Sequence, residues 1–359
     1  MNNVRNIFII VALLSVTTTI AVAAQERFRI MEYNVENMFD TLPNPERNER
    51  SFLPDGANKW TPERYWAKLG RLARAIVATG GDVPVDLIGL VEVESDTVLT
   101  HLTQRTSLAR LGYDYLLTDG LDERGMNVAL LYQRGRFRPL RNESLRVPVA
   151  VAERPTRDVL FVEGLLPTLD TLAVFVAHFP SRRGGKQVAE AQRCRAATLV
   201  RQKVDSIQFR RPDALIVIMG DLNDEVQDAS LKESMGVLPA EVYEEETRWE
   251  RKSSQALYDL TPSCVEHPSV CGTYYYQQEW NLLDHIIVSA SLLNGAAPLF
   301  TPTGKSRILA YPFLVEQGDT PFSPEVRPKR TYLGTHYHGG VSDHFPLQAD
   351  FVLKGFRKK

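Results

Sequence analysis

Cysteine is scarce in this chain, with 3 in 359 residues. No Cys or His cluster has the spacing of a structural zinc site, so a small zinc-stabilised or disulfide-dense fold is excluded. No internal repeat or low-complexity stretch appears after residue 25, which excludes solenoids, collagen and disordered chains. Neither sign of charge dominates, because 42 Lys and Arg oppose 44 Asp and Glu for a formal net charge of −2. Any contact with nucleic acid must therefore come from a local basic patch.

The N-terminal residues contain only a short apolar run. Arg5 precedes an apolar stretch from Ile7 to Val16, and Ala21-Val22-Ala23 offers a small-residue cleavage pattern. Thr17-Thr18-Thr19 interrupt the run and leave an apolar core too short to span about 30 Å of membrane comfortably. We expect residues 1–24 to be a cleaved signal peptide, not a membrane anchor. The mature protein would then be periplasmic or extracellular, with no transmembrane domain.

Export permits disulfide formation. Cys264 and Cys271 lie in one short loop that contains Pro262 and Pro268. We predict a bridge between the two cysteines that stabilises the fold by about 2–3 kcal/mol in the chain-entropy model. Cys194 lies in a helical pattern and is predicted to be a single buried thiol.

Strand-like and helix-like segments alternate without a Pro-, Gly- or Ser-rich seam, so residues 25–359 are predicted to form one domain. Thr61-Pro62 is typical of a helix start and Gly80-Gly81 of its end. A second helix is predicted from about Gln187 to Phe209. Residues 298–340 are less regular, and we expect an insertion there that shapes the substrate cleft. Seven strands are predicted: Phe28–Asn34, Leu87–Val91, Asn127–Tyr132, Leu172–His178, Leu215–Gly220, Leu282–Ser289 and Phe345–Leu353.

Polar residues recur where these apolar strands end or begin. A single such group is normally a turn former or a cap. Burying six sets without purpose would cost several kcal/mol for each unpaired charge. Their convergence on a cation and an anionic substrate gives the pattern a reason. The six sets are Tyr33-Asn34-Val35-Glu36, Leu90-Val91-Glu92-Val93, His178-Phe179-Pro180, Gly220-Asp221-Leu222-Asn223, Leu283-Asp284-His285 and Ser342-Asp343-His344.

The residue types in these sets favour phosphate-ester hydrolysis. Glu, Asp and Asn are hard oxygen ligands without a thiolate cluster, so Mg²⁺ or Mn²⁺ suits them better than zinc. Asp221 and Asn223 are two residues apart, which places both side chains on one side of an extended segment. One can take a proton from water while the other orients it or holds a phosphoryl oxygen. His178 and the Asp343-His344 pair can offset the negative charge that develops on the phosphate.

The ordered set of six motifs resembles the endonuclease/exonuclease/phosphatase superfamily. That family includes deoxyribonuclease-I-like nucleases, abasic-site endonucleases, neutral sphingomyelinases and inositol polyphosphate 5-phosphatases. The similarity spans about residues 27–353. It implies an α/β (α+β) fold, a four-layer α/β/β/α sandwich in which two mixed β-sheets pack face to face with helices outside.

The resemblance also implies four metal-facing residues. Glu92 matches the principal metal-binding glutamate, and Asn34 matches the amide near the metal and the phosphate. Glu36 matches an accessory acid, and Asp343 a second metal-facing acid.

Five further positions match catalytic residues of the family. Asp221 matches the acid that activates or positions water, and Asn223 lies beside it. His178 matches the histidine that contacts the phosphate. Asp284 matches the acid that orients the final histidine, which here is His344.

Two patterns near these motifs have alternative interpretations. Arg182 and Arg183 follow the His178 strand end, and we predict that they bind substrate phosphates; the alternative is a solvated turn before the second helix. Tyr274-Tyr275-Tyr276 can stack on bases or pack into the core beneath Asp284.

We therefore predict a monomeric, Mg²⁺- or Mn²⁺-dependent phosphoesterase that uses water as its nucleophile. A nuclease-type phosphodiesterase acting on DNA or RNA is favoured, without an obligate protein partner. The inositol phosphatase branch is disfavoured, because its Trp-Cys-Asp-Arg signature is replaced by Leu282-Leu283-Asp284-His285. One alternative is a phosphatase or sphingomyelinase-like enzyme on a non-nucleic substrate. The other is a non-catalytic binding module, which should lack at least one of Glu92, Asp221, Asn223 or His344; all four are present.

Overall fold

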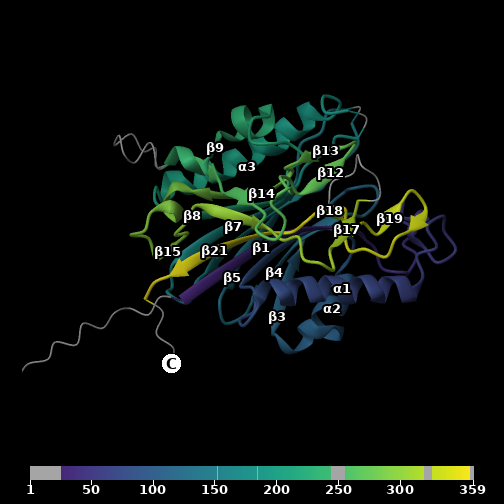
Figure 1. The fold of residues 1–359 in the computed structure, drawn as a ribbon. Helices are drawn as coiled ribbons and strands as arrows, with labels where there is room; N and C mark the ends of the chain where they lie inside the picture. Colours follow the sequence, from purple (N-terminus) through teal and green to yellow (C-terminus); the bar gives the residue numbers. More distant parts are fainter. Residues whose placement is uncertain (1–25, 152, 184, 244–254, 319–325, 356–359) are drawn as a thin grey trace, which may run out of the picture.

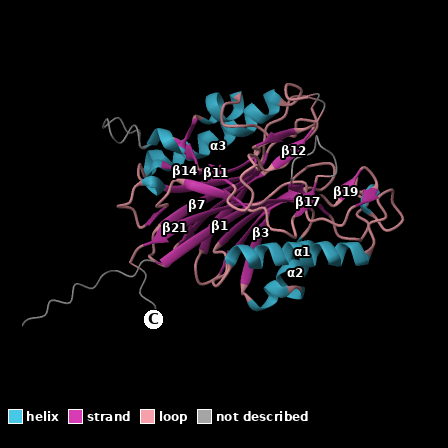
Figure 2. Ribbon diagram, in the orientation of Figure 1, coloured by secondary structure: helices cyan, strands magenta, loops and turns pink. Residues whose placement is uncertain are grey.

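The computed structural model describes residues 26–355 apart from 152, 184, 244–254 and 319–325. Two mixed β-sheets pack face to face and helices cover their outer faces, which confirms the four-layer sandwich (Figure 1, Figure 2). The predicted signal peptide lies outside the described residues. Within the described part of the chain, no helix combines the length and apolarity that crossing a bilayer requires.

The first sheet is built around β1 (Glu26–Met38), which is parallel to β2 (Leu87–Val93) and antiparallel to β21 (Leu347–Leu353). Because β1 and β2 are parallel neighbours, their carboxyl ends bring Asn34 and Glu92 to the same edge. A short strand, β15 (Leu299–Phe300), also pairs with β21. The full strand order of this sheet is β11 (Thr261–Ser263), β16 (Lys305–Ile308), β21, β1, β2, β4 (Asn127–Gln133) and β3 (Tyr113–Leu117).

The second sheet places three predicted site residues side by side. Its register pairs His178 of β7 (Thr171–His178) with Asp221 of β8 (Leu215–Asp221), and Asp221 with Asp284 of β14 (Asp284–Ser289). These three positions lie at one end of the sheet, where β7 and β8 finish and β14 begins. The strand order is β5 (Arg138–Leu145), β6 (Val159–Leu165), β7 (Thr171–His178), β8 (Leu215–Asp221), β14 (Asp284–Ser289), β10 (Leu257–Asp259) and β9 (Val237–Pro239).

The outer layers are helical. Figure 1 shows α1 (Pro62–Gly80) and α2 (Asp96–Arg105) on the first sheet, and α3 (Glu190–Arg210) on the second. The predicted start of α1 is confirmed, since the Thr61 side chain accepts a hydrogen bond from the Arg64 backbone. Helix α3 begins three residues later than predicted. Short helical turns lie at η1 (Arg50–Phe52), η2 (Ser107–Arg110), η3 (Ser230–Met235) and η4 (Ala290–Leu293).

Residues 298–340, where an insertion is expected, lie only partly outside the two large sheets. β15 and β16 lie in this range but belong to the first sheet, where they extend the β21 edge. The segment after β16 instead forms two small hairpins outside the large sheets. These are β17 (Val315–Gln317) with β18 (Val326–Pro328), and β19 (Tyr332–Leu333) with β20 (His336–Tyr337). A third hairpin pairs β12 (Tyr274–Tyr276) with β13 (Glu279–Asn281).

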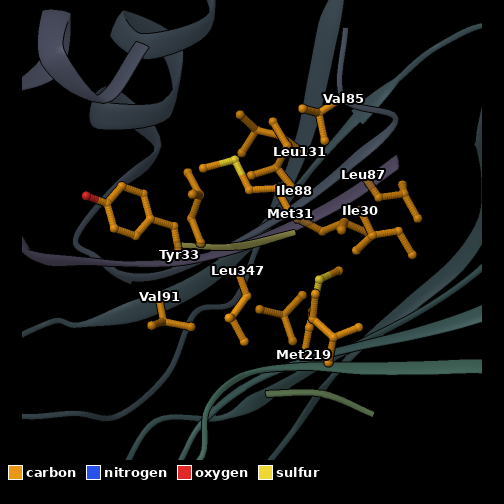
Figure 3. Close-up of a cluster of buried hydrophobic side chains, with 14 of the residues drawn as sticks. Ile30, Met31, Tyr33, Val85, Leu87, Ile88, Val91, Leu131, Met219 and Leu347 are labelled. Atoms are coloured by element: carbon orange, nitrogen blue, oxygen red, sulfur yellow. The ribbon is translucent and has the colours of Figure 1, made fainter. Parts of the chain in front are cut away.

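Apolar side chains fill the space between the sheets. Figure 3 shows part of this core, including Ile30 of β1, Leu87 of β2 and Met219 of β8. A Cβ at Gly89 would lie 2.8 Å from the Met219 sulfur, so β2 needs a glycine where this side chain crosses from the facing sheet. A second apolar cluster lies between the other sheet and α3. The two sheets are therefore fixed against each other beneath the site.

The predicted Cys264–Cys271 disulfide is wrong, because the structure has all three cysteines as free thiols. Cys264 is buried, and its sulfur lies 3.9 Å from a carboxylate oxygen of Glu266. Cys271 is exposed, so the two thiols lie in different environments. Cys194 is partly exposed on α3, which corrects its predicted burial.

Candidate active site

A histidine–aspartate pair lies against the Asp221 carboxylate. His344 Nδ1 is 2.7 Å from Asp284 Oδ2, and His344 Nε2 is 3.9 Å from Asp221 Oδ2. Burial opposes protonation of His344, but the Asp284 carboxylate raises the pKa of the imidazole well above its usual range. His344 is therefore held as a cation whose Nδ1–H donates to Asp284. Burial, together with the charge of Asp284, raises the pKa of Asp221 to about 7.

Two asparagines orient the Asp221 carboxylate. Asn34 Nδ2 donates to Asp221 Oδ2 at 2.9 Å, and the Asn223 backbone N–H donates to Oδ1 at 2.9 Å. The expected extended Asp-x-Asn segment is wrong. β8 ends at Asp221, and Asn223 has a left-handed backbone with φ 53°. Its side chain instead donates to the Phe179 carbonyl at 3.1 Å, which ties the turn after β8 to the end of β7.

Glycine is required immediately before Asp221. Gly220 has φ +142°, and a Cβ there would lie 1.8 Å from the Ala177 carbonyl oxygen. β7 and β8 approach too closely at this point for any side chain. The same approach places His178 Nε2 3.6 Å from Asp221 Oδ2 and 3.9 Å from Glu92 Oε1. Burial and the nearby Arg157 guanidinium lower the pKa of His178 well below its usual range, so this imidazole is neutral.

A second carboxylate group comes from the first sheet and its loops, and consists of Glu36, Glu92 and Asp343. The Asn37 backbone N–H donates to Glu92 Oε2 at 2.6 Å, and the Thr331 backbone N–H donates to Glu36 Oε2 at 2.6 Å. Glu36 and Glu92 have left-handed backbones, with φ 48° and 65°. Such strain is typical of functional sites, and here it occurs at register shifts within β1 and β2, where both residues line the cavity.

Two cations that the sequence analysis missed lie among these acids. Lys68 of α1 is fully buried, and its ammonium donates to the Glu36 backbone carbonyl. Burial lowers the pKa of Lys68 to about 8, although the charge of Glu36 opposes the shift. Burial and the charge of Asp343 raise the pKa of Glu36 to about 8. Arg330, from the segment after β16, lies 3.5 Å from Asp343 Oδ2.

Glu32 is a third residue that was missed. It lies two positions before Asn34 on β1, so the strand period places both side chains on one face. The side chain is fully buried. Burial and the charges of Asp284 and Asp221 raise the pKa of Glu32 well above its usual range, so this carboxyl group is neutral. It lies behind the catalytic candidates.

Most of the predicted residues line one cavity of about 810 Å³. Asn34 and Asp284 lie behind its wall and reach it through their bonds to Asp221 and His344. Arg182 lines it too, but Asp228 at 2.7 Å and Asp224 at 3.4 Å already hold its guanidinium. The predicted residues in the wall are Glu36, Glu92, His178, Arg182, Arg183, Asp221, Asn223, Asp343 and His344.

A comparison with family models identifies the relatives of this arrangement. The model described as the Endonuclease/Exonuclease/phosphatase family matches residues 29–352. The chain belongs to that family. This confirms the resemblance drawn from the six motifs, and it assigns the phosphoesterase fold of the family to nearly the whole described chain. No curated protein matches the sequence.

Solved structures of family members share the fold. An endonuclease/exonuclease/phosphatase family protein from Bacteroides thetaiotaomicron has 16% identity and a TM-score of 0.52, covering 92% of this chain and 99% of its own. A mannosyl-6-phosphatase from the same species has 15% identity and a TM-score of 0.54, covering 91% and 100%. TDP2 from D. rerio, complexed with a single-strand DNA product, has 15% identity and a TM-score of 0.52, covering 90% and 98%.

Proposed function

We propose that the protein is a metal-dependent phosphodiesterase of nuclease type, which cleaves DNA or RNA with an activated water. The observation that carries the proposal is the position of Asp221 in the cavity wall. Its Oδ2 lies 3.6 Å from His178 Nε2 and 3.9 Å from His344 Nε2. A carboxylate that can accept a proton therefore lies between two imidazoles that can donate to phosphoryl oxygens.

The reaction follows from these positions. A water oxygen forms a bond to phosphorus as Asp221 takes the water proton, and the bond from phosphorus to the leaving oxygen breaks. The His344 cation donates from Nε2 to a phosphoryl oxygen, while Asp284 keeps the ring oriented through Nδ1. Neutral His178 adds a second donor. The carboxylates are held by hydrogen bonds before substrate arrives, so little reorganisation is needed.

The residues present fit a divalent cation. Glu36, Glu92 and Asp343 offer oxygen donors in one cavity wall, as Mg²⁺ or Mn²⁺ prefers. The ligand atoms of Asp221, Asp284 and His344 also lie within 4.8 Å of one another. We assign the cation to Glu36, Glu92 and Asp343. In the other group, His344 Nδ1 and Asp284 Oδ2 are already bonded to each other, so neither atom is free to bind the ion. When bound, the ion would neutralise phosphoryl charge and lower the pKa of water.

A phosphatase acting on a sugar phosphate is the second candidate. The mannosyl-6-phosphatase covers this chain as fully as TDP2 does, so the fold does not separate the two reactions. A sphingomyelinase-like activity is less favoured, because the cavity is lined mainly by charged and amide side chains. The binding-module alternative is disfavoured as well, since Glu92, Asp221, Asn223 and His344 all face the same cavity. We further propose that the mature protein is an exported monomer.

Two assays on the purified mature chain test the function. The first is nicking of supercoiled plasmid with Mg²⁺ or Mn²⁺, beside EDTA and Asp221→Ala controls. The second is phosphate release from mannose 6-phosphate. We expect metal-dependent nicking that both controls lack. Phosphate release without nicking, from protein with a cooperative melting transition, would replace the nuclease with the phosphatase.

A further inference from the structure

We propose that Tyr276 is a base-binding residue, at which a nucleobase flanking the scissile phosphate stacks. Tyr274 and Tyr276 are called the aromatic ledge below. The inference rests on the proposed nuclease function and deepens it, because it names single-stranded or unpaired nucleic acid as the substrate class. No residue predicted to act on phosphate belongs to the ledge.

The ledge begins at the catalytic histidine. A β-bridge joins Tyr274 to His344, and their rings stack with centroids 4.7 Å apart and planes 28° apart. The Tyr276 ring follows, 6.0 Å from Tyr274 and tilted by 17°. Three nearly parallel rings therefore lead outward from the reacting group. Because Tyr274 and Tyr276 already stack on each other, an incoming ring would use the outer face of Tyr276.

The hairpin that carries the ledge is anchored on its opposite side. Tyr275 packs on Trp280 at 5.2 Å, and Trp280 stacks on the buried Phe345 at 6.1 Å. Alternation along β12 then directs Tyr274 and Tyr276 to the cavity, whose wall includes both. Tyr276 is nevertheless 52% exposed. A large ring is thus held at the mouth of the cavity without being used by the core.

The charge and the volume of the rest of the cavity indicate which class of ligand it binds. Arg183 lines it as well and supplies positive charge for a second phosphate, whereas Lys186 is already paired with Asp228. Its volume of about 810 Å³ is far larger than one phosphate group requires, so it can hold a base and a flanking nucleotide. The polar lining offers little to an acyl chain. A chain that combines repeated negative charge with flat rings is single-stranded nucleic acid, which proteins bind through basic grooves and aromatic platforms.

The test compares Tyr276→Ala and Tyr276→Phe with wild type on two single-stranded oligonucleotides. One carries every base; the other has an abasic residue beside the scissile phosphate. Phe209→Ala is the matched control, since Phe209 is an exposed ring at the end of α3, 87% accessible and outside the cavity wall. Binding is measured separately in EDTA, by the quenching of a 2-aminopurine placed at the same position.

We expect Tyr276→Ala to lower kcat/KM about tenfold on the complete oligonucleotide, mainly through KM, and to leave the abasic one within about twofold. Tyr276→Phe and Phe209→Ala should behave as wild type, and quenching should be lost only in Tyr276→Ala. Equal effects on both oligonucleotides, or unchanged quenching, would overturn base stacking while leaving the nuclease in place. A folded wild-type enzyme that cleaves neither oligonucleotide would instead overturn the nuclease proposal and the ledge with it.

Discussion

The two carboxylate groups of the site are built in different ways. Asp221 and Asp284, with His344, belong mainly to the second sheet, and each carboxylate bonds to another polar side chain of the site. Glu36 and Glu92 belong to the first sheet, and their carboxylates accept backbone N–H groups. We call the former the proton-transfer group and the latter, with Asp343, the cation group.

The difference fits the two tasks that we propose for these groups. A group that moves protons needs partners that can exchange them, and the Asp284–His344 pair supplies these. A group that holds a cation needs oxygens that are fixed by donors that do not titrate. Backbone amides are such donors. Lys68 and Arg330 add positive charge to the cation group. They keep the acids from repelling one another.

The largest expected effect comes from removing the proton acceptor. Asp221→Asn should lower kcat by about 10²–10⁴-fold, because the amide cannot take a proton from water. Its melting temperature should fall by only a few degrees, because one of the two donors, Asn34 Nδ2 and the Asn223 backbone N–H, can still bond to the single amide oxygen while the other faces the amide nitrogen. Single-turnover cleavage of an oligonucleotide measures the rate. The exposed Asp213→Asn is the matched control, and full activity of Asp221→Asn would remove the proton-transfer group from the mechanism.

The cation group should depend on Lys68 for stability. Lys68→Met removes a fully buried ammonium and leaves buried carboxylates without it, which we expect to lower the free energy of unfolding by about 3 kcal/mol. Urea denaturation measures this change, with the exposed Lys305→Met as its counterpart. Added Mg²⁺ should recover part of the loss, because it supplies the missing charge. An unchanged midpoint would show that the cation group needs no fixed positive charge.

The contribution of His285, the neighbour of Asp284 in the proton-transfer group, to the free energy of unfolding should fall at alkaline pH. Burial opposes its protonation, but the Asp259 carboxylate, 3.1 Å away, raises the pKa of His285 to about 9. The raised pKa favours the folded state fully below the usual value near 6.5, and this contribution is lost as the pH rises to about 9. The difference in unfolding free energy between wild type and His285→Gln should therefore shrink over that window. A difference that does not vary with pH would show that the imidazole is not charged.

The smallest effect concerns the helix that carries Lys68. Thr61→Ala removes the N-cap of α1 and should lower the free energy of unfolding by about 1 kcal/mol, whereas Thr61→Ser should restore it. Thermal unfolding of the two variants provides the test. Equal stability of all three proteins would show that packing alone fixes α1.

The sequence predicted those helices and strands whose ends or apolar runs are marked by short local motifs. The Thr61-Pro62 start and the Gly80 end of α1 are chemical signals of single residues, and the structure has both. Apolar runs such as Leu215–Gly220 identify buried strands. The polar edge strand β5 (Arg138–Leu145) has no such run and was missed. The cysteine bridge failed because loop proximity does not fix where two side chains point.

Within the site, motifs located the polar strand ends but not the buried charges that support them. Glu32 shares the strand period of Asn34, and Lys68 shares the apolar face of α1 with Leu72, so both left a periodic signal. Arg330 left none, because only the tertiary fold brings the segment after β16 to Asp343. The turn at Asn223 depends on a contact with Phe179, 44 residues earlier, which spacing alone does not show.

The division between the two groups is tested most directly by calorimetric titration of Mg²⁺ into wild type, Glu92→Gln and Asp221→Asn. We predict that Glu92→Gln weakens Mg²⁺ binding by at least about tenfold, whereas Asp221→Asn leaves it within about twofold of wild type. The reverse result, with binding lost in Asp221→Asn and kept in Glu92→Gln, would contradict the account. It would move the cation to Asp221, Asp284 and His344, whose ligand atoms lie within 4.8 Å of one another.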